Sequence, residues 1–409
     1  MHSSLAALAD VVYGKSPIEV ADRDGSVPIL GTGGEYGRAL RPMFNSGIVV
    51  PRKGSLSNPQ LSLDPFWPTD TTFAVLPFSE VDTRWLYYCL SNYNLAKLNE
   101  ATGVPSISRD WLLRVNFFNP GRLKQSKIAD VLQTIDRAIE KTEALIDKYQ
   151  QIKAGLMHDL FTRGIGADGK LRPPREQAPK LYQETPIGWI PKEWGYNQLD
   201  SLLASVPNNL RSGPFGSSLL KAELVESGIP FLGIDNIHIE KFKDDFRRFV
   251  SEKKFLELSK YAVRPRDVVI TIMGTVGRSA VIPDGIGQAL SSKHLWTMTF
   301  DSEVVIPELV CWRLNYAPWV KSWFRKETQG GIMDAIQSRT LRTVILPVIP
   351  MEEQEYIFRR YSTMNDALAS EEQKLDKLRK EKSGLMHDLL TGKVPVQIES
   401  EAEPEAAHV

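Results

Sequence analysis

The sequence predicts an α/β fold: two mixed α/β domains separated by two long antiparallel coiled-coil helices, related by a pseudo-twofold internal repeat. The first observation is a repeated string. KAGLMHDLFT at Lys153–Thr162 returns as KSGLMHDLLT at Lys382–Thr391, and the offset of 229 holds without a gap back to Gln125 and Gln354. The second observation is that each copy ends a long heptad-spaced stretch. The third is that short β-rich runs and one helix precede each stretch in the same order. The chain is therefore predicted to consist of two similar halves.

The composition is that of an ordinary globular chain without net charge. Of its 409 residues 42% are hydrophobic and 24% charged, and 50 Lys and Arg balance 50 Asp and Glu. A neutral chain is not a non-specific nucleic-acid coating protein, so any DNA contact must depend on local features. Cys89 and Cys311 are predicted to be buried free thiols. Because the sequence has neither a signal pattern nor an apolar run of about 18 residues, we expect a cytosolic protein.

Residues 1–122 are predicted to form the first domain. The helix is expected at Trp85–Leu98, where apolar side chains recur near the helical period. The strands are expected where short β-rich runs are bounded by turn residues, at Val27–Leu30, Gly47–Val50, Phe73–Leu76 and Val115–Phe118.

Residues 123–163 are predicted to form the first long helix. Its apolar seam runs from Ile128 to Leu160 in steps of four and three residues, with no proline inside and Gly155 as the only glycine. A helix of about 36 residues is roughly 54 Å long, which is more than a single small domain needs. The helix is therefore expected to pack on its own repeat.

Residues 164–186 are predicted to form a linker, because four prolines and three glycines interrupt any helix there. Residues 187–351 are predicted to form the second domain on the plan of the first, with one helix at Glu308–Phe324. Its strands are expected at Ile229–Leu232, Val268–Ile272, Leu295–Phe300 and Val344–Leu346.

Residues 352–392 are predicted to form the second long helix, and residues 393–409 a disordered acidic tail. The seam of the first helix is reproduced 229 positions later, from Ile357 to Leu389. Thr142 and Glu371 interrupt the two seams at equivalent positions. Antiparallel pairing would bring them together to fix the register, unless Glu371 only extends its carboxylate to solvent.

Motifs for catalysis, cofactors and metals are weak. The glycines of Ile29–Gly37 are lost in the repeat, and Asp64–Trp67 is only a distant echo of an amino-methyltransferase motif. His158–Asp159 and His387–Asp388 each lack a third metal ligand, so we interpret them as packing or partner-contact residues. No catalytic, cofactor-binding or metal-binding residues are predicted.

The order of these segments resembles the specificity subunit of type I restriction-modification enzymes. The resemblance is carried by the doubled GLMHDL helix ends at 155–160 and 384–389, by TPIGWIPKEW at Thr185–Trp194 and by GPFGS at Gly213–Ser217. It covers essentially the whole chain. One departure is that the first domain has no counterpart of Trp189–Trp194.

The resemblance implies a non-catalytic subunit of a bacterial or archaeal DNA-defence complex, in the cytoplasm and associated with the nucleoid. The two domains would be target recognition domains, each reading one half of an interrupted, asymmetric site on double-stranded DNA. The helices would set the spacing and dock two methyltransferase subunits, which restriction (helicase-nuclease) subunits join. S-adenosylmethionine, ATP and Mg²⁺ would belong to the partner subunits, and DNA methylation at adenine N6 and ATP-dependent cleavage to the assembled complex.

Residues that could touch DNA are sought among polar and basic side chains and glycines on loops. In the second domain the candidates are Asn208, Asn209, Arg211, Ser212, Gly213, Phe215, Gly216, Ser217, Asn236, His238, Thr275, Arg278, Ser291, Ser292, Lys293, His294, Gln337, Ser338 and Arg339. In the first domain they are Thr32, Tyr36, Arg38, Arg52, Lys53, Ser55, Thr69, Thr71, Ser106, Ser108 and Arg109. Any single one could equally be an exposed, solvated residue or part of an ordinary turn. The first domain is near neutral and the second only slightly basic, so strong affinity is expected to need basic surface from the partners.

Two other functions stay open. One is a stand-alone bipartite DNA-binding or scaffold protein without a methyltransferase partner. The other, that the chain is itself a methyltransferase or nuclease, is disfavoured by the motif search.

Overall fold

The computed structural model describes residues 1–328 and 336–397. The chain forms two compact units, one of residues 1–148 with 369–409 and one of residues 149–368, so that each long helix contributes to both. Residues 398–409 of the predicted acidic tail lie outside the described residues.

The first unit is built on two small sheets. The four-stranded antiparallel sheet has the order β2 (Ala9–Tyr13), β8 (Thr72–Pro77), β5 (Gly47–Pro51) and β6 (Gln60–Ser62). The other has the order β4 (Gly34–Ala39), β3 (Val27–Gly31) and β7 (Trp67–Pro68), with β3 and β7 parallel. β1 (His2–Ser4) pairs with β9 (Asn116–Phe118), and the helices of this domain are α1 (Thr83–Asn92) and α2 (Arg109–Leu113).

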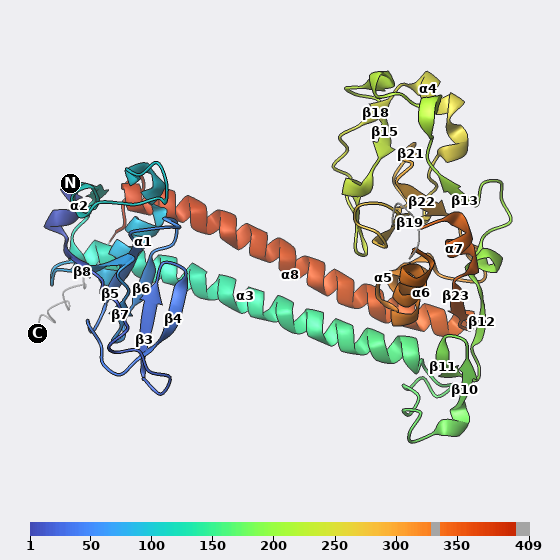
Figure 1. The fold of residues 1–409 in the computed structure, drawn as a ribbon, viewed down its shortest axis with the longest axis horizontal. Helices are drawn as coiled ribbons and strands as arrows, with labels where there is room; N and C mark the ends of the chain where they lie inside the picture. Colours follow the sequence, from blue (N-terminus) through green and yellow to red (C-terminus); the bar gives the residue numbers. More distant parts are fainter. Residues whose placement is uncertain (329–335, 398–409) are drawn as a thin grey trace, which may run out of the picture. The chain divides into compact units, whose positions relative to one another are not determined.

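The second unit repeats this plan (Figure 1). Its antiparallel sheet has the order β13 (Leu210–Ser212), β22 (Leu295–Met298), β19 (Val268–Thr271) and β20 (Ser279–Val281). The other has the order β14 (Leu224–Val225), β18 (Phe249–Val250), β15 (Ile229–Leu232) and β21 (Leu290–Ser291), with β15 and β21 parallel. The short pairs are β12 (Gly195–Gln198) with β23 (Ile345–Val348), β16 (Ile237–His238) with β17 (Lys241–Phe242), and β10 (Tyr182–Thr185) with β11 (Gly188–Pro191). Its shorter helices are α4 (Glu252–Glu257), α5 (Pro307–Tyr316), α6 (Pro318–Thr328) and α7 (Ser338–Thr343).

The two domains have related strand topologies. β3 pairs in parallel with β7, which directly precedes β8 in the chain. In the same way, β15 pairs in parallel with β21, which directly precedes β22. The main sheets share one order, in which β5 and β8 correspond to β19 and β22. The central strands are buried because their side chains are branched or aromatic and apolar on both faces.

Two long helices, α3 (Arg122–Thr162) and α8 (Met351–Thr391), have 41 residues each. Their first residues and their last residues are both 229 positions apart, from 122 to 351 and from 162 to 391. The long helices predicted from the seam are therefore present, with ends within a residue or so of those expected.

One glutamine fixes the start of each long helix to its own domain. Gln125 Oε1 accepts the backbone N–H of Asp82, directly before α1, at 2.8 Å. Gln354 Oε1 accepts the backbone N–H of Ile306, directly before α5, at 2.9 Å. Both glutamines are buried, so these bonds satisfy helix-start donors that water cannot reach.

The last turns of each long helix complete the core of the other domain. Leu389 and Leu390 at the end of α8 pack into the apolar core of the first unit. The equivalent residues of α3, Leu160 and Phe161, pack into a core of the second unit. Each domain is thus held by the start of one long helix and the end of the other.

Glu353 ties the connection after α3 to the start of α8. Its nearly buried carboxylate accepts from Arg172 Nη1 at 2.7 Å, from the backbone N–H of Ile165 at 2.6 Å and from Trp194 Nε1 at 3.0 Å. The stretch predicted as a linker is therefore anchored at Ile165 and Arg172, and its last residues form strand β10.

Two predicted helices are shorter than expected. The helix predicted at Trp85–Leu98 ends at Asn92, because Tyr93 is extended and Asn94 caps a separate 3-10 turn at Leu95–Leu98. The helix predicted at Glu308–Phe324 is divided into α5 and α6 at Pro318, whose ring suits the first turn of a helix but not the interior.

Thr142 and Glu371 each have a partner in their own helix, and their predicted pairing stays a prediction. Thr142 Oγ1 donates to the carbonyl of Ala138 at 2.9 Å, and Glu371 pairs with Lys374 at 3.4 Å. The ion pair with Lys374 agrees with the alternative in which Glu371 extends its carboxylate toward solvent.

We expect Gln125→Ala and Gln354→Ala each to lower the free energy of unfolding by about 1–3 kcal/mol, because each leaves a buried backbone N–H without its acceptor. Denaturant unfolding followed by circular dichroism measures the loss. The control is Gln151→Ala on the exposed face of α3, which should change stability by less than about 0.5 kcal/mol. Equal stability of all three variants would contradict the anchoring role.

Candidate functional site

In both domains a glycine allows two loops to contact each other. One loop follows β2 or β13, the first strand of the main sheet in chain order. The other follows β7 or β21, the strand that pairs in parallel with β3 or β15. A Cβ on Gly14, after β2, would overlap the carbonyl oxygen of Thr69. A Cβ on Gly213, after β13, would overlap the backbone of Ser291 and Ser292. The repeat therefore creates the same loop junction twice, at equivalent places in the two domains.

In the second unit this junction borders a cavity of about 390 Å³. Four predicted residues from separate stretches line it, namely Gly216, Ser292, Lys293 and His294. Gly213, Phe215 and Ser217 belong to the same loop, and the Gly213 N–H donates to the carbonyl of Ser292 at 3.1 Å. The structure thus brings together GPFGS and the 291–294 loop, which the sequence marked separately.

Two cations that line the cavity were missed by the sequence analysis. Lys221 follows the GPFGS loop, and Arg248 directly precedes β18. Arg248 forms an ion pair with Asp235. The adjacent Arg247–Arg248 pair was the available signal, but only the pairing of β18 with β15 places Arg248 beside the other loops.

The cavity is electropositive. Burial lowers the pKa of His294, and the nearby charges of Lys293 and Arg248 lower it further. His294 is therefore held neutral at a pH where a free imidazole would begin to take up a proton.

Several predicted DNA-contacting residues are instead internal to the second unit. Arg211 is buried, donates from Nε to the carbonyl of Ala262 at 2.7 Å and forms an ion pair with Asp267. Burial lowers the pKa of Arg211 and raises that of Asp267. Both shifts show that removing the two charges from water disfavours the ionised forms, which their mutual attraction offsets. Asn236 is buried as well, and its side-chain oxygen accepts the N–H of Gly233 at 2.9 Å.

The remaining candidates of this unit lie on other parts of it. Ser291 is fully buried, and Ser212 donates to the carbonyl of Lys293 at 3.3 Å. Thr275 and Arg278 lie on the turn between β19 and β20, as predicted. The other positions are Asn208 and Asn209 before β13, His238 in β16, and Gln337, Ser338 and Arg339 at the start of α7.

In the first unit, candidates from four stretches converge. Thr32 Oγ1 lies 3.2 Å from the carbonyl oxygen of Lys53 and 3.2 Å from Thr71 Oγ1, which lies 2.9 Å from Thr69 Oγ1. Lys53 also forms a β-bridge with Ser106. The result is a cluster of hydroxyls and one exposed lysine on the side of the domain where β3 and β5 end and β8 begins.

The other first-unit candidates have local partners. Arg52 donates to the carbonyl of Asp70 at 3.2 Å, and its guanidinium lies 5.0 Å from the ring centre of Tyr13. Ser108 caps α2, and Arg109 binds the carbonyl of Val11 and pairs with Asp10. Three more candidates are exposed, namely Tyr36 and Arg38 on β4 and Ser55 on the loop after β5.

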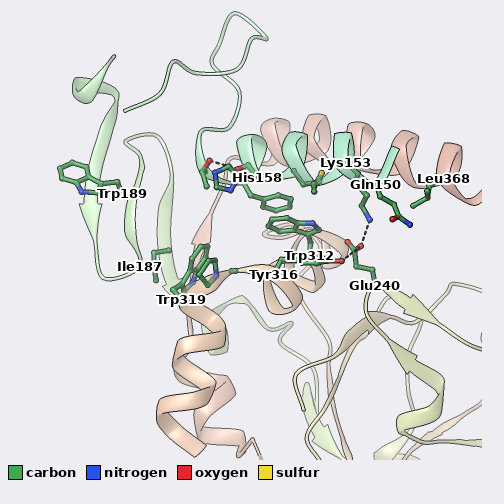
Figure 2. Close-up of a pocket in the computed structure, with 16 residues that line it drawn as sticks. Gln150, Lys153, His158, Ile187, Trp189, Glu240, Trp312, Tyr316, Trp319 and Leu368 are labelled. Atoms are coloured by element: carbon green, nitrogen blue, oxygen red, sulfur yellow. Dashed lines mark hydrogen bonds and ion pairs between the residues drawn. The ribbon is translucent and has the colours of Figure 1, made fainter. Parts of the chain in front are cut away.

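The lysine that begins the repeated helix-end string forms an ion pair in both units, with a residue of the domain in one and of a long helix in the other. Lys153 lies 2.6 Å from Glu240, and the equivalent Lys382 lies 2.6 Å from Asp136. Figure 2 shows Lys153 reaching Glu240, which also accepts from Tyr316 on α5. His158 and Trp312 line the adjoining cavity of about 730 Å³.

Across residues 1–328 and 336–397, no group of three or more His, Cys, Asp or Glu side chains is placed to hold a metal ion. No helix in this part of the chain has the length and apolar character required to span a membrane.

No family model matches the chain. Two curated proteins of Methanocaldococcus jannaschii are similar to it. The type I restriction enzyme MjaVIII specificity subunit is 22% identical over 327 residues, which is 78% of this chain and 71% of that protein. A putative type I restriction enzyme MjaX specificity subunit is 24% identical over 327 residues, 78% of this chain and 70% of that protein.

Among solved structures, the chain is similar to the S subunit of a type I restriction-modification system from M. genitalium. The TM-score is 0.63 at 17% identity, over 97% of this chain and 96% of the other. The resemblance predicted from the sequence is confirmed, since its curated homologues are type I specificity subunits and its mixed α/β fold with two long helices matches an S subunit.

We expect Gly213→Ala to lower the free energy of unfolding by about 1–3 kcal/mol, because the added methyl overlaps the backbone of Ser291 and Ser292. Thermal unfolding measures the loss. Gly285→Ala is the matched control, since a Cβ there meets nothing within 4 Å. If the two variants are equally stable, the loop junction does not need a glycine.

Proposed function

We propose that this chain is a specificity subunit of a type I restriction-modification complex, which reads DNA sequence and is itself non-catalytic. Each globular domain reads one half of an interrupted, asymmetric site on double-stranded DNA. The long helices set the spacing of the halves and dock two methyltransferase subunits. The likeness to type I specificity subunits supports this function, and the predicted absence of catalytic motifs agrees with it.

The observation that carries the proposal is the doubled loop junction. Two domains share one sheet order and one glycine-dependent junction, but the side chains around the junctions differ. A shared frame with different loops suits two readers of different half-sites. We propose residues 1–122 and 187–351 as the target recognition domains.

We further propose that the segments at 123–163 and 352–392 form an antiparallel coiled-coil pair, with 164–186 as the connection. Contacts inside each unit support this. In the first unit Asp136 pairs with Lys382 and Glu143 pairs with Arg379. Residue numbers increase along one helix as they decrease along the other, which is the antiparallel order. In the second unit the Lys153 ammonium lies 5.2 Å from the ring centre of Tyr361, in the same sense.

The proposed docking surface for each methyltransferase subunit is the repeated helix end with its adjoining surface. In the second unit this includes exposed His158 and the aromatic-lined cavity of Figure 2. In the first unit a smaller cavity of about 180 Å³ lies at the equivalent end of α8, beside Leu390 and Thr391. S-adenosylmethionine, ATP and Mg²⁺ are proposed for the partner subunits, as are restriction subunits that join the complex. The complex would act in the cytoplasm of a bacterium or archaeon.

The second candidate is a stand-alone bipartite DNA-binding or scaffold protein. The two-domain frame would serve it equally well, but the likeness to specificity subunits favours the first candidate. The gene neighbourhood distinguishes them, because methyltransferase and helicase-nuclease genes are expected to adjoin the gene of a specificity subunit.

The function is tested by methylome sequencing of cells with and without this gene. We expect an interrupted motif with methylated adenine to disappear on deletion and to return on complementation. If no motif changes while the partner subunits are expressed, the proposed function is wrong.

The spacing role is tested by inserting four helical residues after Thr142. Four residues add about 6 Å to the helix, close to two base-pair steps. We expect a longer spacer in the methylated motif and unchanged half-sites. The same insertion after Asp168, on the exposed turn of the connection, is the control and should leave the spacer unchanged. Altered half-sites in the helix variant would show that the helices do not set the distance.

A further inference from the structure

The cavity beside the loop junction of the second unit is lined by both apolar and basic side chains. Leu219, Leu220, Phe231 and Ile234 supply apolar surface. The polar lining comes from Lys221, Arg248, Lys293, His294 and Ser292. Three cationic side chains on three separate segments therefore face one space of about 390 Å³.

The nearby carboxylates are already engaged. Asp235 pairs with Arg248, and Glu223 pairs with Lys254 rather than with Lys221. Within the described residues, Lys221 and Lys293 are exposed and form no ion pair. The cavity therefore keeps an excess of positive charge that its own acids do not neutralise.

Two polar atoms of the lining residues lack partners. Ser292 Oγ and Arg248 Nε are buried and accept or donate no hydrogen bond within the described residues. A buried polar atom without a partner is costly to the folded state, and such atoms concentrate where a ligand completes the site. Both are suited to an anionic oxygen, because a hydroxyl and a guanidinium N–H are donors.

We propose that this cavity binds one backbone phosphate of duplex DNA, with Arg248, Lys293 and Lys221 as its cations and the adjoining sugar against Leu219 and Phe231. The inference rests on the proposed DNA-reading function and deepens it. A phosphate fits better than a base edge because the charged groups are all cations, whereas base readout uses mixed donors and acceptors. The contact would fix the register of the second domain on the duplex without reading sequence.

The first domain lacks this site. Strands β3 and β15 carry the related strings PILG and PFLG, and Leu30 and Leu232 lie opposite Pro68 and Ser291. Asp70 lies two residues after Pro68, and Lys293 lies two residues after Ser291, so Asp70 and Lys293 occupy equivalent positions. A carboxylate there would repel a phosphate, so the proposed site belongs to the second domain alone.

The test is equilibrium binding of the full-length chain to a mixed-sequence duplex of about 30 base pairs, over a series of salt concentrations. Each neutralised phosphate contributes about 0.9 to the slope of log K against log salt. We expect Arg248→Gln and Lys293→Gln each to weaken binding about ten-fold and to reduce the slope by up to about 0.9, because both cations act on one phosphate, equally on every duplex. The control is Arg247→Gln, whose exposed side chain pairs with Asp245 and should change neither quantity.

The outcomes separate this inference from the function on which it rests. If the unaltered chain binds no duplex at any salt concentration, either alone or together with the methyltransferase subunits it is proposed to dock, the DNA-reading function and the phosphate site both fail. If the unaltered chain binds but both variants keep its slope, only the phosphate site fails. A loss confined to one sequence would also overturn it, because that marks a base contact. Arg248→Gln also removes the ion pair to Asp235 and could therefore destabilise the protein. In that case Lys293→Gln alone tests the phosphate site, because the Lys293 side chain is exposed.

Discussion

The structure depends on one constraint: a 41-residue helix has an apolar stripe that a single small domain cannot cover. Each long helix is therefore divided between two packing partners. Its start is fixed to its own domain by a buried glutamine, Gln125 or Gln354, and its last turns fill the core of the other unit. Because both helices obey the same rule, each unit contains one helix start and one helix end.

Differences between the two loop junctions are electrostatic as well as steric. The first domain surrounds its junction with hydroxyls, in the network of Thr32, Thr69 and Thr71. The second surrounds it with cations, and burial together with the charges of Lys293 and Arg248 lowers the pKa of His294. A chain without net charge thus concentrates positive charge at one place. This local excess is invisible in the composition, where 50 basic residues balance 50 acidic ones.

The sequence was sufficient for the repeat, the long helices and the central strands, because periodicity and offset are local or additive properties. It failed where a distant partner decides the outcome. Arg211 looked like a DNA contact, but its partner Asp267 lies 56 positions away and draws it into the interior. Arg248 was overlooked for the converse reason, since only strand pairing places it beside the cavity. The breaks at Asn94 and Pro318 were readable in principle, but helical periodicity on both sides concealed them. Which candidates touch DNA stays a prediction.

The core of the first unit is completed by residues near the end of the chain, and this affects folding during synthesis. Leu389 and Leu390 fill a core whose other residues, up to Leu132, precede them by roughly 250 positions, which a ribosome covers in about 10–50 s. During that interval the nascent first domain exposes the apolar surface that these two leucines later cover. The protein is therefore expected to depend on chaperones during synthesis more than its final packing suggests. A stop codon anywhere before the end of α8 would release a first domain whose core is still open.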